Sequence, residues 1–356
     1  MAALDLKIPD RVPIFDIAVD YPIVKAITGK EIALTAQTIE NDLKVMAECN
    51  SKLGLDFFVY YPGYGISESG KVNYIKEKTY IDSWGAIRKE LDFPAYEHLY
   101  IGGSIKNEED YANFHFPDPQ KAIDALLDVE RTLKEIQEHL LLVGGVVGGF
   151  TTGMEMRGVA NFLIDCHRNP QFAKRIMDTV YSFNIEIAKA FADIGVDVVL
   201  YDDDYADLKG PLLAPKIWRD LVKPYQNSFV KEFRKRGLWA IEHSDGNLNL
   251  ILDDLIEPGL SGLHPIEPLA MKIGEVKKRY GSRICLIGNV DCGNTMTLGT
   301  EEDVRRDVRR CIDEASAGGG HILSASNSLH WQIPVRNVLA MADEAKRYGR
   351  YQKNGG

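Results

Sequence analysis

The sequence predicts a (β/α)8 barrel of the TIM type, and three observations favour it. Short runs rich in β-branched and aromatic residues recur, most are followed by segments with helical periodicity, and the runs are apolar throughout rather than alternating. Eight runs are candidate strands: 12–18, 56–61, 140–147, 196–203, 238–245, 260–267, 283–291 and 321–327.

Continuous apolar strands that alternate with helices are typical of a parallel sheet buried on both faces. Eight such units in 356 residues indicate a closed barrel, and a doubly wound open sheet is the alternative. The run GGVVGG at 144–149 lacks the spacing of a phosphate-binding loop, so we interpret it as a place of close backbone approach.

Two of the intervening helices are clear from their ends. A helix over 215–236 begins at a proline, which the first helical turn tolerates, and stops at Gly237. Another over 301–316 follows Thr300, carries acidic residues in its first turn, and ends before three glycines.

Residues 1–356 form one predicted domain, because no Pro/Gly/Ser-rich linker or low-complexity segment divides them. Residues 62–139 are less regular than the rest of the chain. We expect loops and helices there, inserted over the mouth of the barrel.

Composition limits the partners. A formal net charge of -10 and a pI near 5.4 argue against a nucleic-acid or anionic-membrane surface. Five scattered cysteines fit a reducing compartment, and neither a signal sequence nor a membrane span is seen, so we expect a cytoplasmic protein. Small molecules or another protein are the expected partners, and a homodimer is left open.

Polar residues collect at the ends of the predicted strands, where barrel enzymes carry their chemistry. Because side chains at i and i+2 of a strand share a face, His243 and Asp245 can face one pocket, as can Asn289 and Asp291. Further strand-end candidates are Asp16, Tyr60, Tyr61, Tyr201, Asp202, Asp203, Asp204, Glu267, Ser326 and Asn327.

Several candidates also have a structural alternative, and Asp202, Asp203 and Asp204 could be largely solvated. Asp245 and Asp291 could cap the helices that follow them, and His243 could be a satisfied core histidine. Tyr60, Tyr61 and Trp84 could be ordinary core aromatics. Metal binding through His243, Asp245 and a third group from another strand is a further hypothesis, with oxygen-rich ligands and no thiolate.

Several segments together resemble one family. HSDGN, DLIEPGLSGLHPIEP, KRYGSRICLIGNVD, LGTEEDVRRDVRRCID and GGGHILSASNSLHWQIPVRNVLAM resemble, in order and spacing, the C-terminal half of the uroporphyrinogen decarboxylase superfamily. The upstream segments DRVPIFDIAVDYPIVKAITGKEI, TYIDSWGAIRKE and MEMRGVANFLID are similar to its first half. The resemblance implies a (β/α)8 barrel.

The superfamily contains decarboxylases and cobalamin-dependent methyltransferases. The decarboxylases carry an arginine-rich segment after the first strand, whereas this chain has FDIAVDYPIVKAI. Without those arginines, bidentate recognition of many carboxylates loses its donors. The resemblance therefore implies the methyltransferase branch, including the anaerobic O-demethylases. Its thiol-methylating members bind zinc through H-x-C and a distant cysteine, but Asp245 and Asn327 occupy those cysteine positions here.

We therefore expect a methyltransferase that moves a methyl group from a small, methoxylated aromatic donor to the Co(I) of cobalamin on a separate corrinoid protein. The expected catalytic residues are His243, Asp245 and Glu267, with His243 and Asp245 as metal candidates. The expected substrate-binding residues are Asp16, Tyr60, Tyr61, Trp84, Tyr201, Asp202, Asn289, Asp291 and Asn327.

Two other functions remain open at this point. A cofactor-independent decarboxylase of a smaller carboxylated substrate would need a cationic pocket, built from Arg11, Arg157 or Lys209. A non-catalytic binding protein would bind a ligand tightly and be indifferent to loss of the His243 imidazole.

Overall fold

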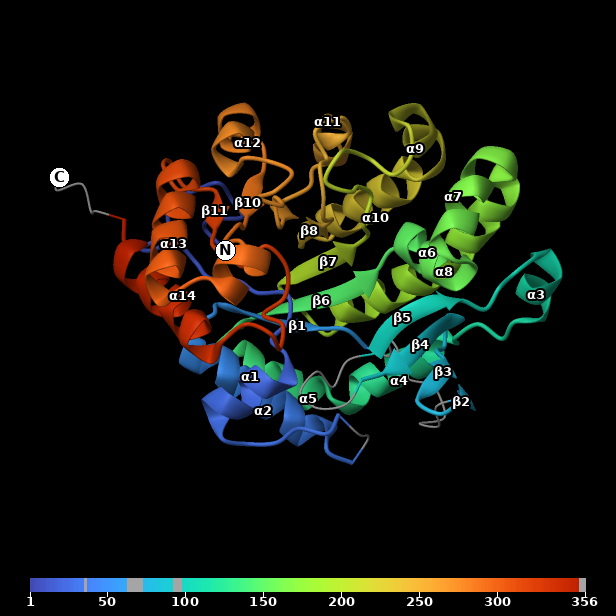
Figure 1. The fold of residues 1–356 in the computed structure, drawn as a ribbon, viewed down its shortest axis with the longest axis horizontal. Helices are drawn as coiled ribbons and strands as arrows, with labels where there is room; N and C mark the ends of the chain where they lie inside the picture. The colour runs from blue at the N-terminus through green and yellow to red at the C-terminus, as the bar shows by residue number, and fades with distance from the viewer. Residues whose placement is uncertain (35–36, 63–72, 92–97, 352–356) are drawn as a thin grey trace.

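A curled parallel sheet forms the centre of the protein. The computed structural model describes residues 1–34, 37–62, 73–91 and 98–351. Seven strands pair in the order β1-β6-β7-β8-β9-β10-β11, all parallel (Figure 1). They are β1 (Phe57–Tyr60), β6 (Leu141–Val147), β7 (Val198–Asp202), β8 (Trp239–His243), β9 (Gly262–His264), β10 (Cys285–Ile287) and β11 (His321–Ile322), and each lies within a predicted run.

The first predicted strand, 12–18, is not a strand of the structure. Ile14 forms an isolated parallel bridge with Leu323, and the Phe15 amide donates to the Leu323 carbonyl over 2.8 Å. On the other side, the Asp56 amide donates to the Ile14 carbonyl, also over 2.8 Å. Pro13 has no N–H to extend this ladder. The described sheet is thus TIM-barrel-like, with seven strands.

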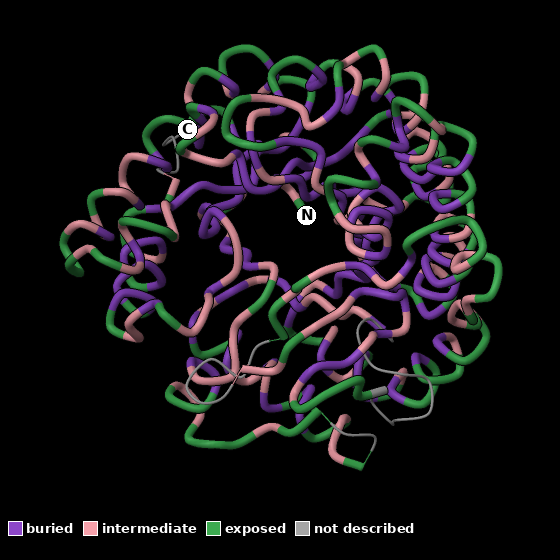
Figure 2. Tube along the Cα trace, turned by 45° about the vertical axis from the view of Figure 1, so that its right-hand side comes forward, coloured by how far each residue is buried: buried purple, intermediate pink, exposed green. Residues whose placement is uncertain are grey.

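Helices cover the outer face of the sheet. Figure 2 shows buried segments toward the centre and exposed segments around the outside. The helices are α1 (Tyr21–Thr28), α2 (Ile39–Leu53), α6 (Gly149–Arg157), α7 (Val159–Arg168), α8 (Pro170–Asp193), α9 (Pro215–Leu221), α10 (Lys223–Lys235), α11 (Leu252–Ile256), α12 (Ile273–Tyr280), α13 (Glu301–Ala315), α14 (Val335–Tyr348) and a π-helical turn η1 (Cys292–Met296).

The ends of two helices test the sequence prediction. In α13, Thr300 and Asp303 form the reciprocal bonds of a capping box, which confirms the predicted start. The helix predicted over 215–236 is instead two helices, α9 and α10, which meet at Val222. Pro224 explains the break, because a proline cannot donate the next helical hydrogen bond and its ring crowds the preceding turn.

Successive side chains along each strand point alternately into two hydrophobic cores. Val198, Leu200 and Ile241 belong to the cluster inside the sheet, together with Phe15 and Phe57. Their neighbours Val199, Tyr201 and Ala240 belong to the larger cluster under the helices. This period of two continues past the strand ends, so it determines which polar side chains point inward.

Residues 62–139 contain an antiparallel sheet that the sequence did not predict. Its order is β2 (Asn73–Lys76), β3 (Thr79–Ile81), β4 (Ala86–Glu90) and β5 (His98–Gly103), followed by α3 (Glu108–Asn113), α4 (Pro119–Asp128) and α5 (Glu130–Gln137). Residues 63–72 and 92–97 of the predicted insertion lie outside the described residues. The sheet is tied to α6, where Arg88 donates to Glu155 over 2.7 Å.

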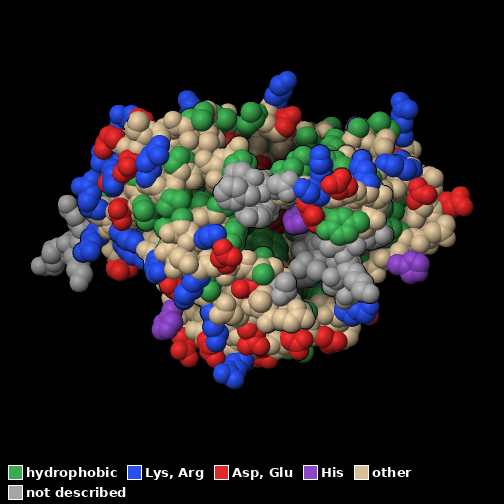
Figure 3. Space-filling model, turned by 60° about the horizontal axis from the view of Figure 1, so that its bottom comes forward, with side chains coloured by type: hydrophobic (Ala, Val, Ile, Leu, Met, Phe, Trp, Pro, Cys, Tyr) green, Lys and Arg blue, Asp and Glu red, His purple; other side chains and the backbone are tan. Residues whose placement is uncertain are grey.

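The surface carries charges of both signs. On the face drawn in Figure 3, acidic and basic side chains are interspersed around a recess. Within the described ranges, every helix is too short or too polar to cross a bilayer.

Candidate active site

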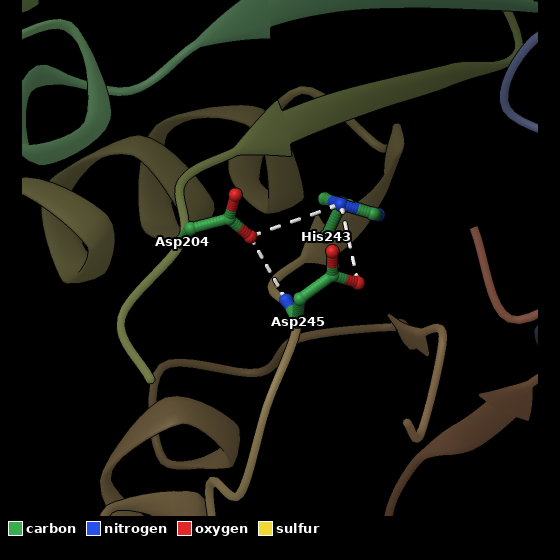
Figure 4. A group of neighbouring side chains, drawn as sticks. All are labelled: Asp204, His243 and Asp245. Carbon is green, nitrogen blue, oxygen red and sulfur yellow. Dashed lines mark hydrogen bonds and ion pairs between the residues drawn. The ribbon is translucent and has the colours of Figure 1, made fainter. Parts of the chain in front are cut away.

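Three carboxylates surround the imidazole of His243 at the carboxyl ends of β7 and β8. The Nε2 atom of His243 lies 3.9 Å from Asp202 Oδ1, 3.8 Å from Asp204 Oδ1 and 3.8 Å from Asp245 Oδ1. Figure 4 shows Asp204, His243 and Asp245 pointing toward one another. We call these four residues the His243 cluster.

The strand pattern explains the cluster. Asp202 continues the inward face of Val198 and Leu200, and His243 continues that of Ile241. The two following loops are then held together, because the Asp245 amide donates to Asp204 Oδ1 over 2.9 Å. The side chain of Asp245 therefore faces the cluster rather than capping a helix.

Two further predicted residues hold the carboxylates in place. The Tyr61 hydroxyl donates to Asp202 Oδ2 over 3.0 Å, and Asn327 Nδ2 donates to Asp245 Oδ2 over 2.7 Å. Gly145 makes room for Tyr61, since a Cβ at that position would lie 2.5 Å from the tyrosine ring. The predicted close backbone approach in GGVVGG is confirmed here.

His264 is a part of the site that the sequence analysis missed. It ends β9 in register with His243, and the two Nδ1 atoms lie 2.6 Å apart. The side chain is completely buried. Two histidines at equivalent positions of successive predicted strands were a signal that could have found it. The sequence analysis also noted Asp204, the third carboxylate of the cluster, without assigning it a role.

Burial and repulsion between like charges raise the pKa values of two acids in the cluster. Burial raises the pKa of Asp202, and burial with the charges of Asp204 and Asp202 raises the pKa of Asp245 to about 6. Burial alone would lower the pKa of His243, but the carboxylates of Asp202, Asp245 and Asp204 outweigh it and raise that pKa. The arrangement favours the imidazolium form of His243 and the protonated forms of Asp202 and Asp245.

Glu267 adds an acidic group whose charge acts on His243, and Asp16 is a further buried acid. Burial, then the Asp245 charge, raises the pKa of Glu267 to about 7. Asp16 is 2% exposed, accepts a hydrogen bond from the Leu329 amide, and has its Oδ2 without a partner among the described residues. Burial raises its pKa well above the usual range.

Three predicted aromatic contacts instead pack in or against the core under the helices, with Trp84 and Tyr201 buried and Tyr60 half-buried. Trp84 is 3% exposed and packs edge-on against Phe183. Tyr60 packs on Phe191 of α8, and Tyr201 packs on Phe229 of α10. Tyr60 and Tyr201 occupy strand positions that face the helices, so the period of two directs them away from the His243 cluster.

Asn289 and Asp291 also have structural roles. Asn289 is fully buried and accepts a hydrogen bond from Arg310 of α13 over 3.2 Å, so its side chain faces a helix. Asp291 caps η1 by accepting from the amides of Gly293 and Asn294. The capping alternative weighed for Asp291 is the one that the structure favours.

The cluster offers ligands for a metal ion. One ligand atom each from Asp204, His243 and Asp245 lie within 4.8 Å of one another. A zinc site with thiolates does not fit, because Asp245 and Asn327 stand at the expected cysteine positions and bond to each other. A nitrogen and several carboxylate oxygens suit a harder divalent ion such as Mn²⁺.

The cations proposed for a carboxylate-binding pocket are paired with other acids or exposed. Arg11 forms a two-point ion pair with Asp56, Arg157 pairs with Asp165, and Lys209 is exposed on a loop. Among the described residues, no lysine or arginine forms an ion pair with Asp16, Glu267 or the carboxylates of the His243 cluster.

A curled parallel sheet with a polar cluster at its carboxyl edge defines the class of TIM-barrel-like enzymes. Within that class, the model of the uroporphyrinogen decarboxylase (URO-D) family matches residues 86–348, and the chain belongs to this family.

Relatives agree with this assignment, and two solved structures share the fold. The chain is 21% identical to a uroporphyrinogen decarboxylase of Actinobacillus succinogenes over 73% of its length and 74% of the relative's, and 22% identical to one of Neisseria meningitidis serogroup C over 71% and 72%. A methyltransferase from Methanosarcina mazei superposes with a TM-score of 0.75 at 20% identity, covering 98% of this chain and 97% of that one. A B12-independent methionine synthase from Shewanella superposes with a TM-score of 0.58 at 10% identity, covering 95% and 98%.

Proposed function

We propose that the protein is the substrate component of a cobalamin-dependent O-demethylase, which works in the cytoplasm under anaerobic conditions. It takes a methyl group from a small methoxylated aromatic donor and delivers it to the Co(I) centre of a separate corrinoid protein. The observation that carries the proposal is the His243 cluster, an imidazole among acids at the carboxyl edge of the sheet. The similarity in fold to a named methyltransferase supports it.

Part of the cluster reaches the surface. The side chains of Asp204 and Asp245 are 38% and 32% exposed, so the cluster opens to solvent although the His243 side chain is only 6% exposed. When docked there, a Co(I) corrinoid supplies the nucleophile that accepts the methyl group. This chain's residues bind and orient the donor and provide for the leaving oxygen.

The leaving oxygen needs a proton, because a phenol has a pKa near 10 and the expelled phenolate is a poor leaving group. His243 Nε2 is the atom placed to donate it. The neighbouring carboxylates raise the pKa of His243 and so favour the imidazolium form that can donate the proton. A positioned acid contributes about 10²–10⁴-fold to the rate.

A divalent ion held by Asp204, His243 and Asp245 could do the same work as a Lewis acid on the ether oxygen. Asp202 would remain hydrogen-bonded to Tyr61 beside it. The donor set favours an ion that prefers oxygen over one that prefers sulfur.

Decarboxylation is the second candidate, because the curated relatives carry that name. The charge of the site argues against it. A carboxylated substrate would meet acidic residues. Of the cations proposed for it, Arg11 and Arg157 are paired with other acids and Lys209 is exposed.

We also propose that the barrel is complete. The hydrogen bonds of residues 13–15 to both Leu323 and Asp56 support an eighth, irregular strand between β11 and β1.

The test mixes the purified protein, without oxygen, with cob(I)alamin and uncharged donors such as 2-methoxyphenol. We expect the change in corrinoid absorption that accompanies methylation, together with release of the demethylated phenol. Failure with every methoxyarene, or release of CO₂ from carboxylated compounds without cobalamin, would contradict the proposal.

A further inference from the structure

His243 and His264 share a short contact that constrains both rings. Their Nδ1 atoms lie 2.6 Å apart, so one must donate a proton and the other must accept it. Both side chains are buried, His264 completely and His243 to 5% exposure. The rings lie with their centroids 4.9 Å apart and tilted by 32°.

The surroundings of His264 indicate which nitrogen accepts. Its other nitrogen, Nε2, is buried without a hydrogen-bond partner among the described residues, and the Ala325 carbonyl is the backbone group that interacts with the His264 ring. A lone pair aimed at a carbonyl oxygen would be repelled, whereas an N–H is attracted. The proton of neutral His264 therefore belongs on Nε2. Its Nδ1 is then the acceptor, and His243 Nδ1 is the donor.

This arrangement determines what the functional nitrogen of His243 can do. With a proton fixed on Nδ1, His243 Nε2 points at Asp202, Asp204 and Asp245 with its lone pair available, at 3.8–3.9 Å from each carboxylate. That atom can then take up a proton or bind a metal ion. In the opposite arrangement, Nε2 would carry the only proton of a neutral ring and could not bind a metal.

We propose that His264 is a positioning residue that holds a proton on Nδ1 of His243 and so keeps Nε2 as the atom that acts. The inference rests on the proposed function in taking His243 as the reacting residue. Partners of this kind, which orient a ligand or acid through its second nitrogen, typically change affinity or activity by about 10–100-fold when removed.

The direct test is the long-range ¹H–¹⁵N spectrum of the protein labelled with ¹⁵N-histidine, which reports which ring nitrogen carries a proton. The signals of His243 are identified by their loss in His243→Gln. We expect Nδ1 of His243 to be protonated in the wild type even at alkaline pH. A bare Nδ1, with the proton on Nε2, would overturn the proposal.

Variants of His264 distinguish a positioning role from a role in filling the core. His264→Leu removes the acceptor and should release the Nδ1 proton of His243, whereas His264→Asn can present Oδ1 as an acceptor and should retain it. His321→Asn is the matched control, because His321 is equally buried but bonds to Ser316 and the Gly288 carbonyl. An unchanged His243 spectrum in folded His264→Leu would also overturn the proposal.

Affinity for Mn²⁺ alone, measured by calorimetry, gives a second readout. It should fall by about 10–100-fold in His264→Leu and recover in His264→Asn. Equal affinity in wild type and His264→Leu would count against the positioning role. These measurements use no donor or corrinoid, so the proposed methyl transfer can fail while the positioning role stands.

Discussion

The two carboxylate oxygens of Asp245 have different surroundings. Oδ2 accepts a hydrogen bond from Asn327, whereas Oδ1 is buried without a hydrogen-bond partner among the described residues and faces His243. Asp245→Asn keeps the shape and removes the charge that raises the pKa of His243. We expect methyl transfer to slow by about 10–100-fold. The rate of corrinoid methylation measures this, with Asp291→Asn, at the cap of η1, as the control that stays near wild type.

The raised pKa of Glu267 predicts that the stability of the protein depends on pH. That pKa is about 7 in the folded chain, against about 4.3 in an unfolded chain. The folded state thus holds the proton more tightly, and the wild type loses stability as pH rises from about 4 to about 7. Glu267→Gln does not titrate, so it should gain stability relative to the wild type over that window, by on the order of 1 kcal/mol after allowance for partial exposure.

Denaturant unfolding at several pH values measures this difference. Glu48→Gln is the control of opposite sign, because hydrogen bonds from Lys30 and Lys52 lower the pKa of Glu48 to about 2. Its difference from the wild type should change only below about pH 5. A flat difference for Glu267→Gln between pH 4 and 7 would contradict the assigned pKa.

Residue roles were only partly predictable from sequence. His243, Asp245, Asp202, Tyr61 and Asn327 do meet, since strand ends in a parallel sheet converge. The sequence could not say which strand-end residues face the helices instead, because that depends on a register that one residue of error reverses. Tyr60 and Tyr201 were misassigned for this reason, as was Asn289, whose partner Arg310 lies on a helix.

At the scale of elements, β6 shows how backbone contact shapes the site. Tyr61 packs against Gly145, and an added Cβ would lie 2.5 Å from its ring. Gly145→Ala should destabilise the protein by about 1–3 kcal/mol and displace the Tyr61 hydroxyl from Asp202. Gly274→Ala is the control. It lies in α12 near the flexible end of Glu314, where alanine suits a helix better than glycine. Thermal unfolding compares the two, and equal melting temperatures would contradict the close-contact assignment.

Elements themselves were predicted to different degrees. Seven of the strand predictions hold because buried parallel strands leave long apolar runs. The antiparallel sheet β2–β5 was missed, because its short strands, such as AIRKE in β4, are charged and half-exposed. One helix was predicted over 215–236 although it contains Pro224, and proline within a helical pattern is a stop signal.

At the scale of the whole molecule, acidic groups are concentrated at one edge of the sheet. Asp202, Asp204, Asp245 and Glu267 are drawn from three separate stretches of chain, and His243 is the imidazole that the structure places among them. Burying like charges together costs stability, and sites that accept such a cost are commonly functional. This charge also favours neutral or cationic ligands over anionic ones.

The most direct measurement is the rate at which the protein methylates cob(I)alamin from its donor in the wild type, in His243→Ala, and in His321→Asn as the control for loss of a buried histidine. Because Nε2 of His243 is assigned to the leaving oxygen, the account predicts a loss of about 10²–10⁴-fold in His243→Ala with the control close to wild type. An equal rate in wild type and folded His243→Ala would contradict it.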